Sequence, residues 1–146
     1  MAKTMISTST MKGNIIFVDT SALFAIANVR DEDHRKAREF LSKLAEERVT
    51  FLVTNFIISE IYTLMLRKIG RNKAIEYVEK LSNTAEIERV SKEDESQAWQ
   101  IILRCQDKHF SYVDATSFAV MERLGINDAF SFDEHFRQYS FNRLPD

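Results

Sequence analysis

Short apolar runs and longer segments of helical periodicity alternate along the chain. The longer segments repeat apolar residues every three or four positions, and they predict helices at 20–28, 31–48, 55–69, 71–82, 92–108 and 111–124. The short runs are typical of buried strands, and they predict strands at 15–18, 49–54, 85–90, 127–132 and 140–144, the last at an edge. Gly70 and Gly125 follow two of the helical segments, where a glycine commonly ends a helix. Because helices separate the strands, the pattern favours an α/β sandwich with a largely parallel sheet.

The composition is typical of one globular domain. The chain has 146 residues, of which 45% are hydrophobic and 29% charged, so it can bury a core and is not disordered as a whole. No apolar run approaches the ~20 residues that cross a bilayer, so we expect no membrane association. Residues 1–12 show no periodicity, and we expect a flexible tail there, before a single domain at 13–146. One cysteine, Cys105, excludes an internal disulfide and, with no visible secretion signal, predicts a cytoplasmic protein.

The net charge of −2 argues against a generally basic nucleic-acid-binding protein, but the charge is unevenly distributed. Four basic residues fall within seven positions: Arg67, Lys68, Arg71 and Lys73. Such a cluster is suited to contact the phosphates of an RNA backbone. It is equally well explained as helix-terminal charge that complements a helix dipole. The sequence alone favours neither interpretation.

Two acidic residues directly follow predicted strands. Asp19 comes after the strand 15–18, and Asp133 comes after the strand 127–132. Ligands of parallel α/β sheets bind outside the carboxyl ends of the strands, so we expect both carboxylates at the same edge. Each residue taken alone is also explained as the cap of a following helix.

Two further acids lie on predicted helices. Glu60 stands at the edge of the apolar stripe of helix 55–69, where desolvation of a carboxylate is costly unless a cation compensates. The alternative is a boundary glutamate whose carboxylate reaches water. Asp114 lies in the first turn of helix 111–124, and a favourable interaction with the helix dipole explains it by itself.

Together, the four carboxylates indicate a metal site. Close carboxylates repel one another and cannot all ionise without a cation. Oxygen ligands with no His or Cys cluster nearby suit Mg²⁺ or Mn²⁺ rather than zinc. The chain contains no P-loop and no dinucleotide-binding glycine motif, so a nucleotide-binding loop is not supported.

Four segments carry a resemblance to a known family. They are IIFVDTSALFAI (15–26), ISEIYTLMLRKIG (58–70), SYVDATSFAVMERLGI (111–126) and AFSFDEHF (129–136). In order and separation they resemble the PIN domain, and the size is similar to that of the VapC-type ribonuclease toxins of prokaryotic toxin–antitoxin pairs. The resemblance implies a three-layer α/β/α sandwich and a Mg²⁺- or Mn²⁺-dependent endoribonuclease. The extension of 12 residues before the first strand departs from the family pattern.

The resemblance also implies roles for individual residues. The acids that match the family's catalytic and metal-binding positions are Asp19, Glu60, Asp114 and Asp133. Ser21 matches a hydroxyl that commonly supports the first acid, and Ser131 stands where a threonine is more usual. The absence of a His/Lys pair near these motifs argues against a metal-free ribonuclease mechanism.

The expected partners are an RNA substrate, a cognate antitoxin and a second copy of the chain. Tyr62 and Leu66 lie off the main apolar stripe of helix 55–69 and are suited to a protein–protein contact. Two other interpretations stay open. One is a non-catalytic PIN scaffold that binds RNA or protein and retains its acids for folding. The other is a PIN nuclease of RNA processing rather than a toxin.

Overall fold

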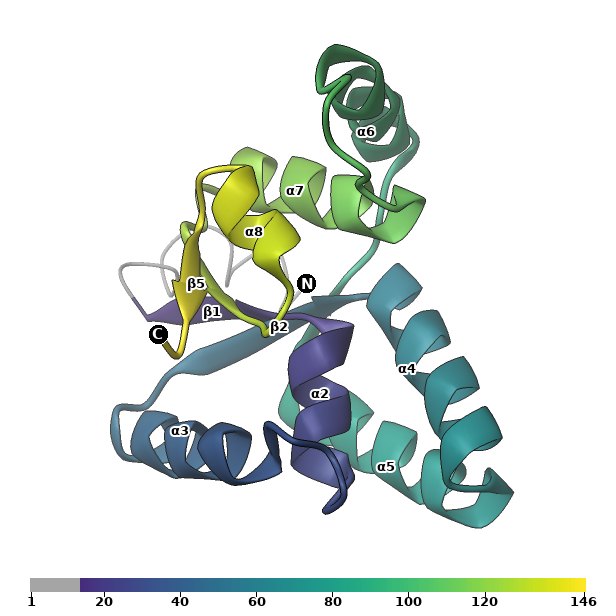
Figure 1. The fold of residues 1–146 in the computed structure, drawn as a ribbon, viewed down its shortest axis with the longest axis vertical. Helices are drawn as coiled ribbons and strands as arrows, with labels where there is room; N and C mark the ends of the chain where they lie inside the picture. The colour runs from purple at the N-terminus through teal and green to yellow at the C-terminus, as the bar shows by residue number, and fades with distance from the viewer. Residues whose placement is uncertain (1–13) are drawn as a thin grey trace.

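A computed structural model describes residues 14–146, in which helices cover both faces of a parallel sheet (Figure 1). The five strands lie in the order β3-β2-β1-β4-β5, and every neighbouring pair is parallel. Their bounds are β1 (Ile15–Val18), β2 (Thr50–Thr54), β3 (Glu86–Glu88), β4 (Asp128–Phe130) and β5 (Asn142–Leu144). The predicted α/β/α sandwich is therefore confirmed, and all five predicted strands are present. The predicted flexible tail, residues 1–12, lies outside the described residues.

The helices divide between the two faces of the sheet. They are α2 (Thr20–Ala27), α3 (His34–Glu46), α4 (Asn55–Lys68), α5 (Arg71–Thr84), α6 (Lys92–Arg104), α7 (Tyr112–Leu124) and α8 (Glu134–Gln138). In Figure 1, α7 and α8 lie above the sheet with α6 beyond α7, whereas α2, α3, α4 and α5 lie below it. No helix within residues 14–146 combines the length and the apolar character that crossing a membrane requires.

Two helix predictions need correction, and one short helix was not predicted. The helix expected at 31–48 begins only at His34, because the Asp31 side chain accepts a hydrogen bond from the backbone N–H of Asp33 (2.8 Å) and forms a turn instead. It ends at Glu46, before Arg48 adopts a left-handed backbone with φ 56°. The helix expected at 92–108 ends at Arg104. The short helix α8 was not among the predicted elements, because five residues give no periodicity to detect.

The sheet register determines where the site forms. All four residues of β1 are buried, and β1 pairs with β4 through Phe17 with Ala129 and Val18 with Phe130. Beyond this register the backbone N–H of Asp19 donates to the carbonyl oxygen of Phe130 (3.0 Å). The two segments that follow β1 and β4 therefore leave the sheet side by side at its carboxyl edge.

Candidate active site

Asp19 lies between β1 and α2 with its carboxylate fixed by hydroxyl groups. As the N-cap of α2 it accepts a hydrogen bond at Oδ2 from the Ser21 backbone N–H (3.3 Å). The same oxygen accepts from Ser21 Oγ (2.7 Å) and from Ser131 Oγ (3.0 Å). The residue is only 4% exposed. Within residues 14–146, Oδ1 has no hydrogen-bond partner, so one oxygen is anchored and the other is available to a ligand.

The two serines join the loop after β4 to the start of α2. Ser131 Oγ accepts a hydrogen bond from the Asp133 backbone N–H (3.0 Å), and Ser21 Oγ accepts one from the Phe132 backbone N–H (2.9 Å). Each hydroxyl thus donates to Asp19 and accepts from the segment that carries Asp133. The structure places both predicted supporting residues at the carboxylate they were expected to support.

Asp114 and Asp133 both cap helices, as the local interpretation of each predicts. Asp114 Oδ2 accepts from the backbone N–H of Ser111 (3.1 Å), and Ser111 Oγ accepts from the backbone N–H of Asp114 (3.0 Å), which forms a capping box on α7. Asp133 Oδ1 accepts from the backbone N–H of His135 (2.9 Å) at the start of α8. Capping uses one oxygen of each carboxylate, so it does not exclude a second role for the other oxygen.

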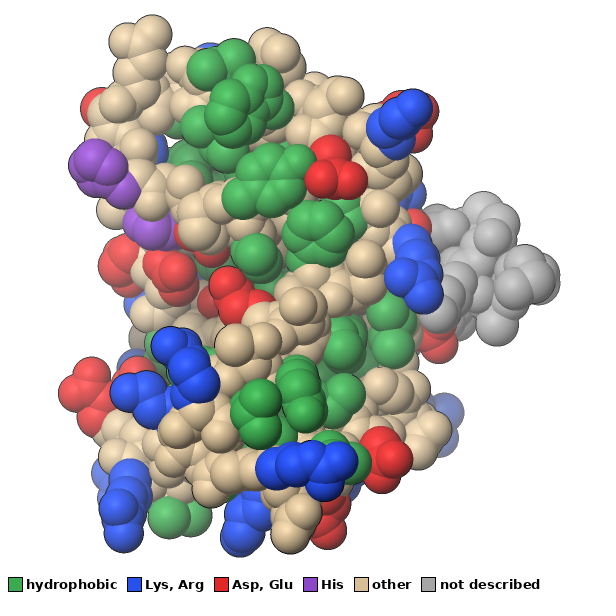
Figure 2. Space-filling model, turned by 90° about the vertical axis from the view of Figure 1, so that its right-hand side faces the viewer, with side chains coloured by type: hydrophobic (Ala, Val, Ile, Leu, Met, Phe, Trp, Pro, Cys, Tyr) green, Lys and Arg blue, Asp and Glu red, His purple; other side chains and the backbone are tan. Residues whose placement is uncertain are grey.

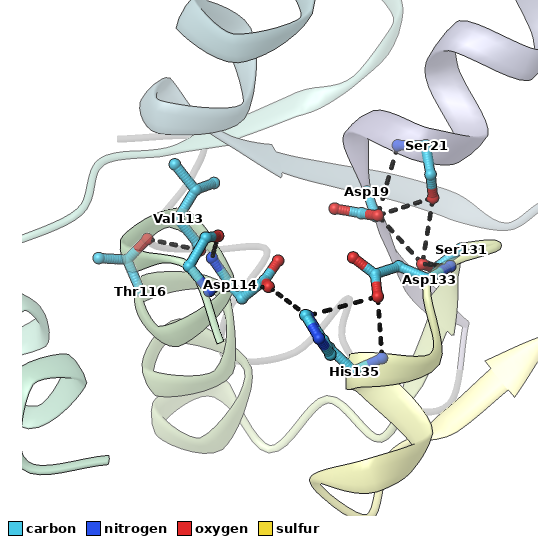
Figure 3. A network of polar contacts seen from close by, with 9 residues as sticks. Asp19, Ser21, Val113, Asp114, Thr116, Ser131, Asp133 and His135 are labelled. Atoms are coloured by element: carbon cyan, nitrogen blue, oxygen red, sulfur yellow. Dashed lines mark hydrogen bonds and ion pairs between the residues drawn. The ribbon is translucent and has the colours of Figure 1, made fainter. Parts of the chain in front are cut away.

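The three aspartates converge on one space. In Figure 3 the carboxylates of Asp19, Asp114 and Asp133 point toward one another from the ends of β1, α7 and the loop before α8. The pKa of Asp19 is raised to about 7, chiefly by burial and also by the negative charges of Asp114 and Asp133, against the opposing hydrogen bonds of Ser21 and Ser131. A cluster in which carboxylates disfavour one another's ionisation is suited to bind a cation.

Glu60 reaches the same cluster from α4. Its Oε1 accepts a hydrogen bond from Thr20 Oγ1 (2.5 Å), which ties α4 to the start of α2. Burial raises the pKa of Glu60, and the charges of Asp114 and Asp133 act in the same direction. The carboxylate is half-buried, and the charges of other acids in the cluster act on its pKa. The structure therefore brings all four predicted acids together.

A cavity of about 720 Å³ extends along α4 beside Glu60. It is lined by Thr20, Asn55, Phe56, Ser59, Glu60, Thr63, Leu64, Arg67 and Val113. The four residues of the basic cluster are exposed, at the end of α4 and the start of α5, and Arg67 alone of the four lines this cavity. Figure 2 shows the side of the molecule on which α4 lies, with acidic side chains near its middle and basic side chains over its lower half.

Two residues at the site escaped the sequence analysis. Thr20 directly follows Asp19, and a hydroxyl at that position was the signal that could have identified it. The second is His135, whose Nδ1 is 2.7 Å from Asp114 Oδ2 and 3.4 Å from Asp133 Oδ1. The signal for His135 was its place two residues after Asp133, on the first turn of α8.

The donor set fits a divalent cation. Asp114, Asp133 and His135 each present a ligand atom within 4.8 Å of the others, and the free oxygen of Asp19 faces the same space in Figure 3. Carboxylate oxygens are the ligands that Mg²⁺ and Mn²⁺ prefer, and imidazole nitrogen extends the range toward transition metals. The residues present therefore fit either ion.

Comparison with known proteins gives consistent matches. The sequence profile of the PIN domain matches residues 16–142. The chain is 35% identical over 128 residues to the 23S rRNA-specific endonuclease VapC20 of Mycobacterium tuberculosis, covering 87% of this chain and 95% of that protein. It is 24% identical over 123 residues to ribonuclease VapC26 of the same organism, covering 83% of this chain and 89% of that protein.

Solved structures agree with the sequence matches. The crystal structure of VapC20 of M. tuberculosis, described as a sarcin-ricin loop cleaving toxin, superposes with a TM-score of 0.81 at 34% identity, covering 88% of this chain and 98% of that chain. A structure of VapBC2 from Rickettsia felis bound to a fragment of promoter DNA gives a TM-score of 0.55 at 10% identity, covering 82% and 99%. The second similarity concerns the fold alone.

Proposed function

The chain belongs to the PIN domain family, and on that premise we propose that it is a metal-dependent endoribonuclease, the toxin of a VapBC-type toxin–antitoxin pair. One observation carries the proposal. Asp19, Asp114 and Asp133 each have one carboxylate oxygen held by protein donors, and within residues 14–146 the other oxygen has no hydrogen-bond partner. Three fixed carboxylates with free oxygens turned to one space are suited to bind Mg²⁺ or Mn²⁺.

The residues divide the work at this site. Asp19 and Asp114 are the most buried of the acids and would hold the ion, while Glu60 and Asp133 complete its surroundings. When bound, the ion lowers the pKa of water and neutralises charge on the phosphate group. Ser21 and Ser131 fix Asp19, and Thr20 fixes Glu60, so that the carboxylates keep their positions when RNA enters.

RNA reaches the acids along the cavity beside α4. Arg67 stands at the far end of this cavity from Glu60, and Lys68, Arg71 and Lys73 extend the positive charge beyond it. In this proposal these side chains hold the sugar–phosphate backbone and contribute affinity without sequence selection. Because the relative VapC20 is a 23S rRNA-specific endonuclease, ribosomal RNA is the substrate class to test first.

The toxin proposal includes a cognate antitoxin in the cytoplasm and a second copy of the chain. Four large apolar side chains are exposed on α4, α6 and the start of α7: Leu66, Trp99, Leu103 and Tyr112. Trp99 and Leu103 are one turn apart on α6, so they share a face. Of the two residues expected to form such a surface, Leu66 is exposed, whereas Tyr62 packs partly against the core. We assign the face of α6 that carries Trp99 and Leu103 to homodimer contact.

Dimerisation is tested by light scattering across a dilution series. Wild type should be a dimer at high concentration, and Trp99→Glu should shift it to monomer because it places a charge in the contact. Val29→Glu is the matched control, since Val29 is the most exposed large apolar residue and lies on the loop after α2. A wild-type monomer at the highest concentration would remove this part of the proposal.

Cleavage of purified ribosomal RNA and of a mixed RNA pool tests the central activity. We expect cleavage with Mg²⁺ or Mn²⁺, none in chelator, and none for Asp19→Asn. Asp107→Asn is the control, because Asp107 is exposed and pairs with Lys108, away from the acid cluster. Cleavage that persists in chelator, or an active Asp19→Asn variant, contradicts the metal-nuclease proposal. An inactive wild type with intact metal binding would favour the non-catalytic scaffold.

A further inference from the structure

His135 contacts two of the four acids, although the family resemblance gave it no role. It is the second residue of α8, and its side chain is 28% exposed. Phe110 packs against the ring in a T-shaped arrangement, with ring centroids 5.3 Å apart and an interplanar angle of 77°. The next residue, Phe136, is fully buried and anchors α8 to the core. Packing therefore holds the imidazole where it is, independently of any ligand.

The contacts of His135 involve a single ring nitrogen. Nδ1 lies 2.7 Å from Asp114 Oδ2 and 3.4 Å from Asp133 Oδ1. We assign the ring hydrogen to Nδ1, which then donates it to the carboxylate oxygen Asp114 Oδ2. The backbone N–H of His135 donates to Asp133 Oδ1 (2.9 Å). One residue thus holds one oxygen on each of two acids that come from different elements.

We propose that His135 is a positioning residue that fixes Asp114 and Asp133 for the metal ion and does not itself bind the metal. It occupies Asp114 Oδ2 and Asp133 Oδ1, which leaves Asp114 Oδ1 and Asp133 Oδ2 free for the ion. Figure 3 shows the ring between the two carboxylates. The inference rests on the proposed metal site and deepens it.

Among the described residues, Asp19, on the other side of the cluster, also has hydrogen-bond donors on only one of its carboxylate oxygens. Ser21 and Ser131 donate to Asp19 Oδ2 and leave Oδ1 free, just as His135 and Ser111 donate to Asp114 Oδ2 and leave its Oδ1 free. Donors behind a metal ligand fix its orientation, and their removal typically weakens metal binding by about 10- to 100-fold. A nitrogen already engaged in a 2.7 Å hydrogen bond to a carboxylate is not free to coordinate an ion.

Three substitutions separate positioning from ligation. The amide nitrogen of asparagine is bonded to Cγ, as Nδ1 of histidine is, so His135→Asn can still donate to Asp114. In glutamine the amide lies one bond further along the chain and misses that position, and His135→Ala has no donor. We expect Mn²⁺ affinity within about threefold of wild type for His135→Asn, and a loss of about 10- to 100-fold for His135→Gln and His135→Ala.

The measurement is Mn²⁺ binding, followed through the EPR signal of the free ion. His109→Ala is the matched control, because His109 is an exposed histidine on the loop before α7, and this variant should bind Mn²⁺ like wild type. Thermal melts in chelator establish that each variant is folded. If His135→Ala does not fold, the contrast between the Asn and Gln variants carries the test.

Two spectroscopic measurements add independent tests. NMR of the ring nitrogens in the metal-free protein should find the hydrogen of His135 on Nδ1. Pulsed EPR of the Mn²⁺-loaded protein should find no directly coordinated nitrogen from His135. A coordinated imidazole nitrogen that disappears in His135→Asn would overturn positioning in favour of ligation.

Mn²⁺ binding distinguishes failure of the role of His135 from failure of the metal site itself. If wild type binds Mn²⁺ and His135→Ala binds it equally well, the role of His135 is wrong and the metal site stands. If wild type binds no Mn²⁺, the metal site and the role of His135 are both wrong.

Discussion

Asp94 and Asp114 occupy the same position in two neighbouring helices, yet their surroundings are opposite. Each is the third residue of its helix and forms a capping box, with Ser91 on α6 and with Ser111 on α7. Each is buried, at 3% and 8% exposure. From the helix start alone the two aspartates are indistinguishable.

The difference lies in what faces the free part of each carboxylate. Arg123 donates to Asp94 through Nε to Oδ1 (2.8 Å) and through Nη2 to Oδ2 (2.8 Å). Burial alone would raise the pKa of Asp94, but the hydrogen bonds and charge of Arg123 outweigh it and lower that pKa below its ordinary value. Asp114 instead faces Asp19 and Asp133, and its one charged or chargeable donor among the described residues is His135. The ion pair between Asp94 and Arg123 joins α6 to α7. Asp114 lies among other carboxylates instead, and that environment is suited to bind a cation.

The largest expected contrast between the two aspartates is in RNA cleavage. Asp114→Asn removes a charge that the metal ion requires, and we expect at least ~10²-fold slower cleavage, corresponding to about 3–4 kcal/mol of lost transition-state stabilisation. Asp94→Asn should cleave at a rate within a few-fold of wild type, because Asp94 does not face the site. Initial rates on the same RNA under metal saturation measure both. Equal losses in the two variants would mean that Asp114 acts only as a helix cap.

The free energy of unfolding should change with pH in opposite directions for the two regions. The pKa of Asp19 is raised from the ordinary 3.8 to about 7, so the folded protein binds a proton that the unfolded chain releases between these values. Metal-free protein should therefore lose stability as pH rises from about 4 to 7, by up to about 1.4 kcal/mol for each unit. The Asp94–Arg123 pair, with a lowered pKa, stabilises the fold above the ordinary carboxyl range and loses this contribution as pH falls through the lowered value.

Urea denaturation in chelator across this pH range measures the effect of Asp19. Asp19→Asn can still cap α2 and should show a much flatter pH dependence than wild type. An unchanged slope would show that Asp19 ionises normally in the folded protein, and the buried acid cluster would then be misdescribed.

At constant pH the two aspartates should also differ in stability. Asp94→Asn removes one of the two hydrogen bonds to Arg123 and the negative charge that strengthens the other, and should destabilise the fold by about 2 kcal/mol. Asp114→Asn removes repulsion from the acid cluster, so the metal-free fold should be unchanged or more stable, as is common at functional sites. Chemical denaturation in chelator gives both values. A large loss for Asp114→Asn would make that residue mainly structural.

The smallest expected effect belongs to the basic cluster outside both regions. Arg71→Ala should weaken RNA binding modestly and reduce the slope of log affinity against log salt by about 1. Mn²⁺ binding should not change, since Arg71 is exposed at the start of α5. Filter binding over a salt series measures the slope, and an unaltered slope would assign the cluster to helix-end charge instead of RNA contact.

The features that the sequence predicts correctly are those that depend on neighbouring residues in the chain. The unbroken apolar run of β1 identifies a buried strand, and the shared carboxyl edge of parallel strands predicts that Asp19 and Asp133 lie together. Capping of α7 by Asp114 followed from its place in the first turn. These inferences need only the residue's neighbours in the chain.

What the sequence did not determine depends on partners distant along the chain. Arg123 lies 29 residues from Asp94, and His135 lies 21 residues from Asp114, so no local pattern separates the two capping aspartates. The role of His135 also depends on α8, whose five residues are too few for a periodic signal. For Glu60, both a buried and a solvated carboxylate were consistent with the stripe on its helix, and the bond from Thr20 decides its position.

The most direct test of the account is calorimetric Mn²⁺ binding at neutral pH to wild type, Asp94→Asn and Asp114→Asn. The account predicts saturable binding by wild type and by Asp94→Asn, and loss of that binding in Asp114→Asn. The two variants each lose one buried capping carboxylate, so they differ only in which partners that carboxylate faces. Equal binding by all three proteins, or loss in Asp94→Asn with retention in Asp114→Asn, would contradict the claim that the cluster around Asp114 is the metal site.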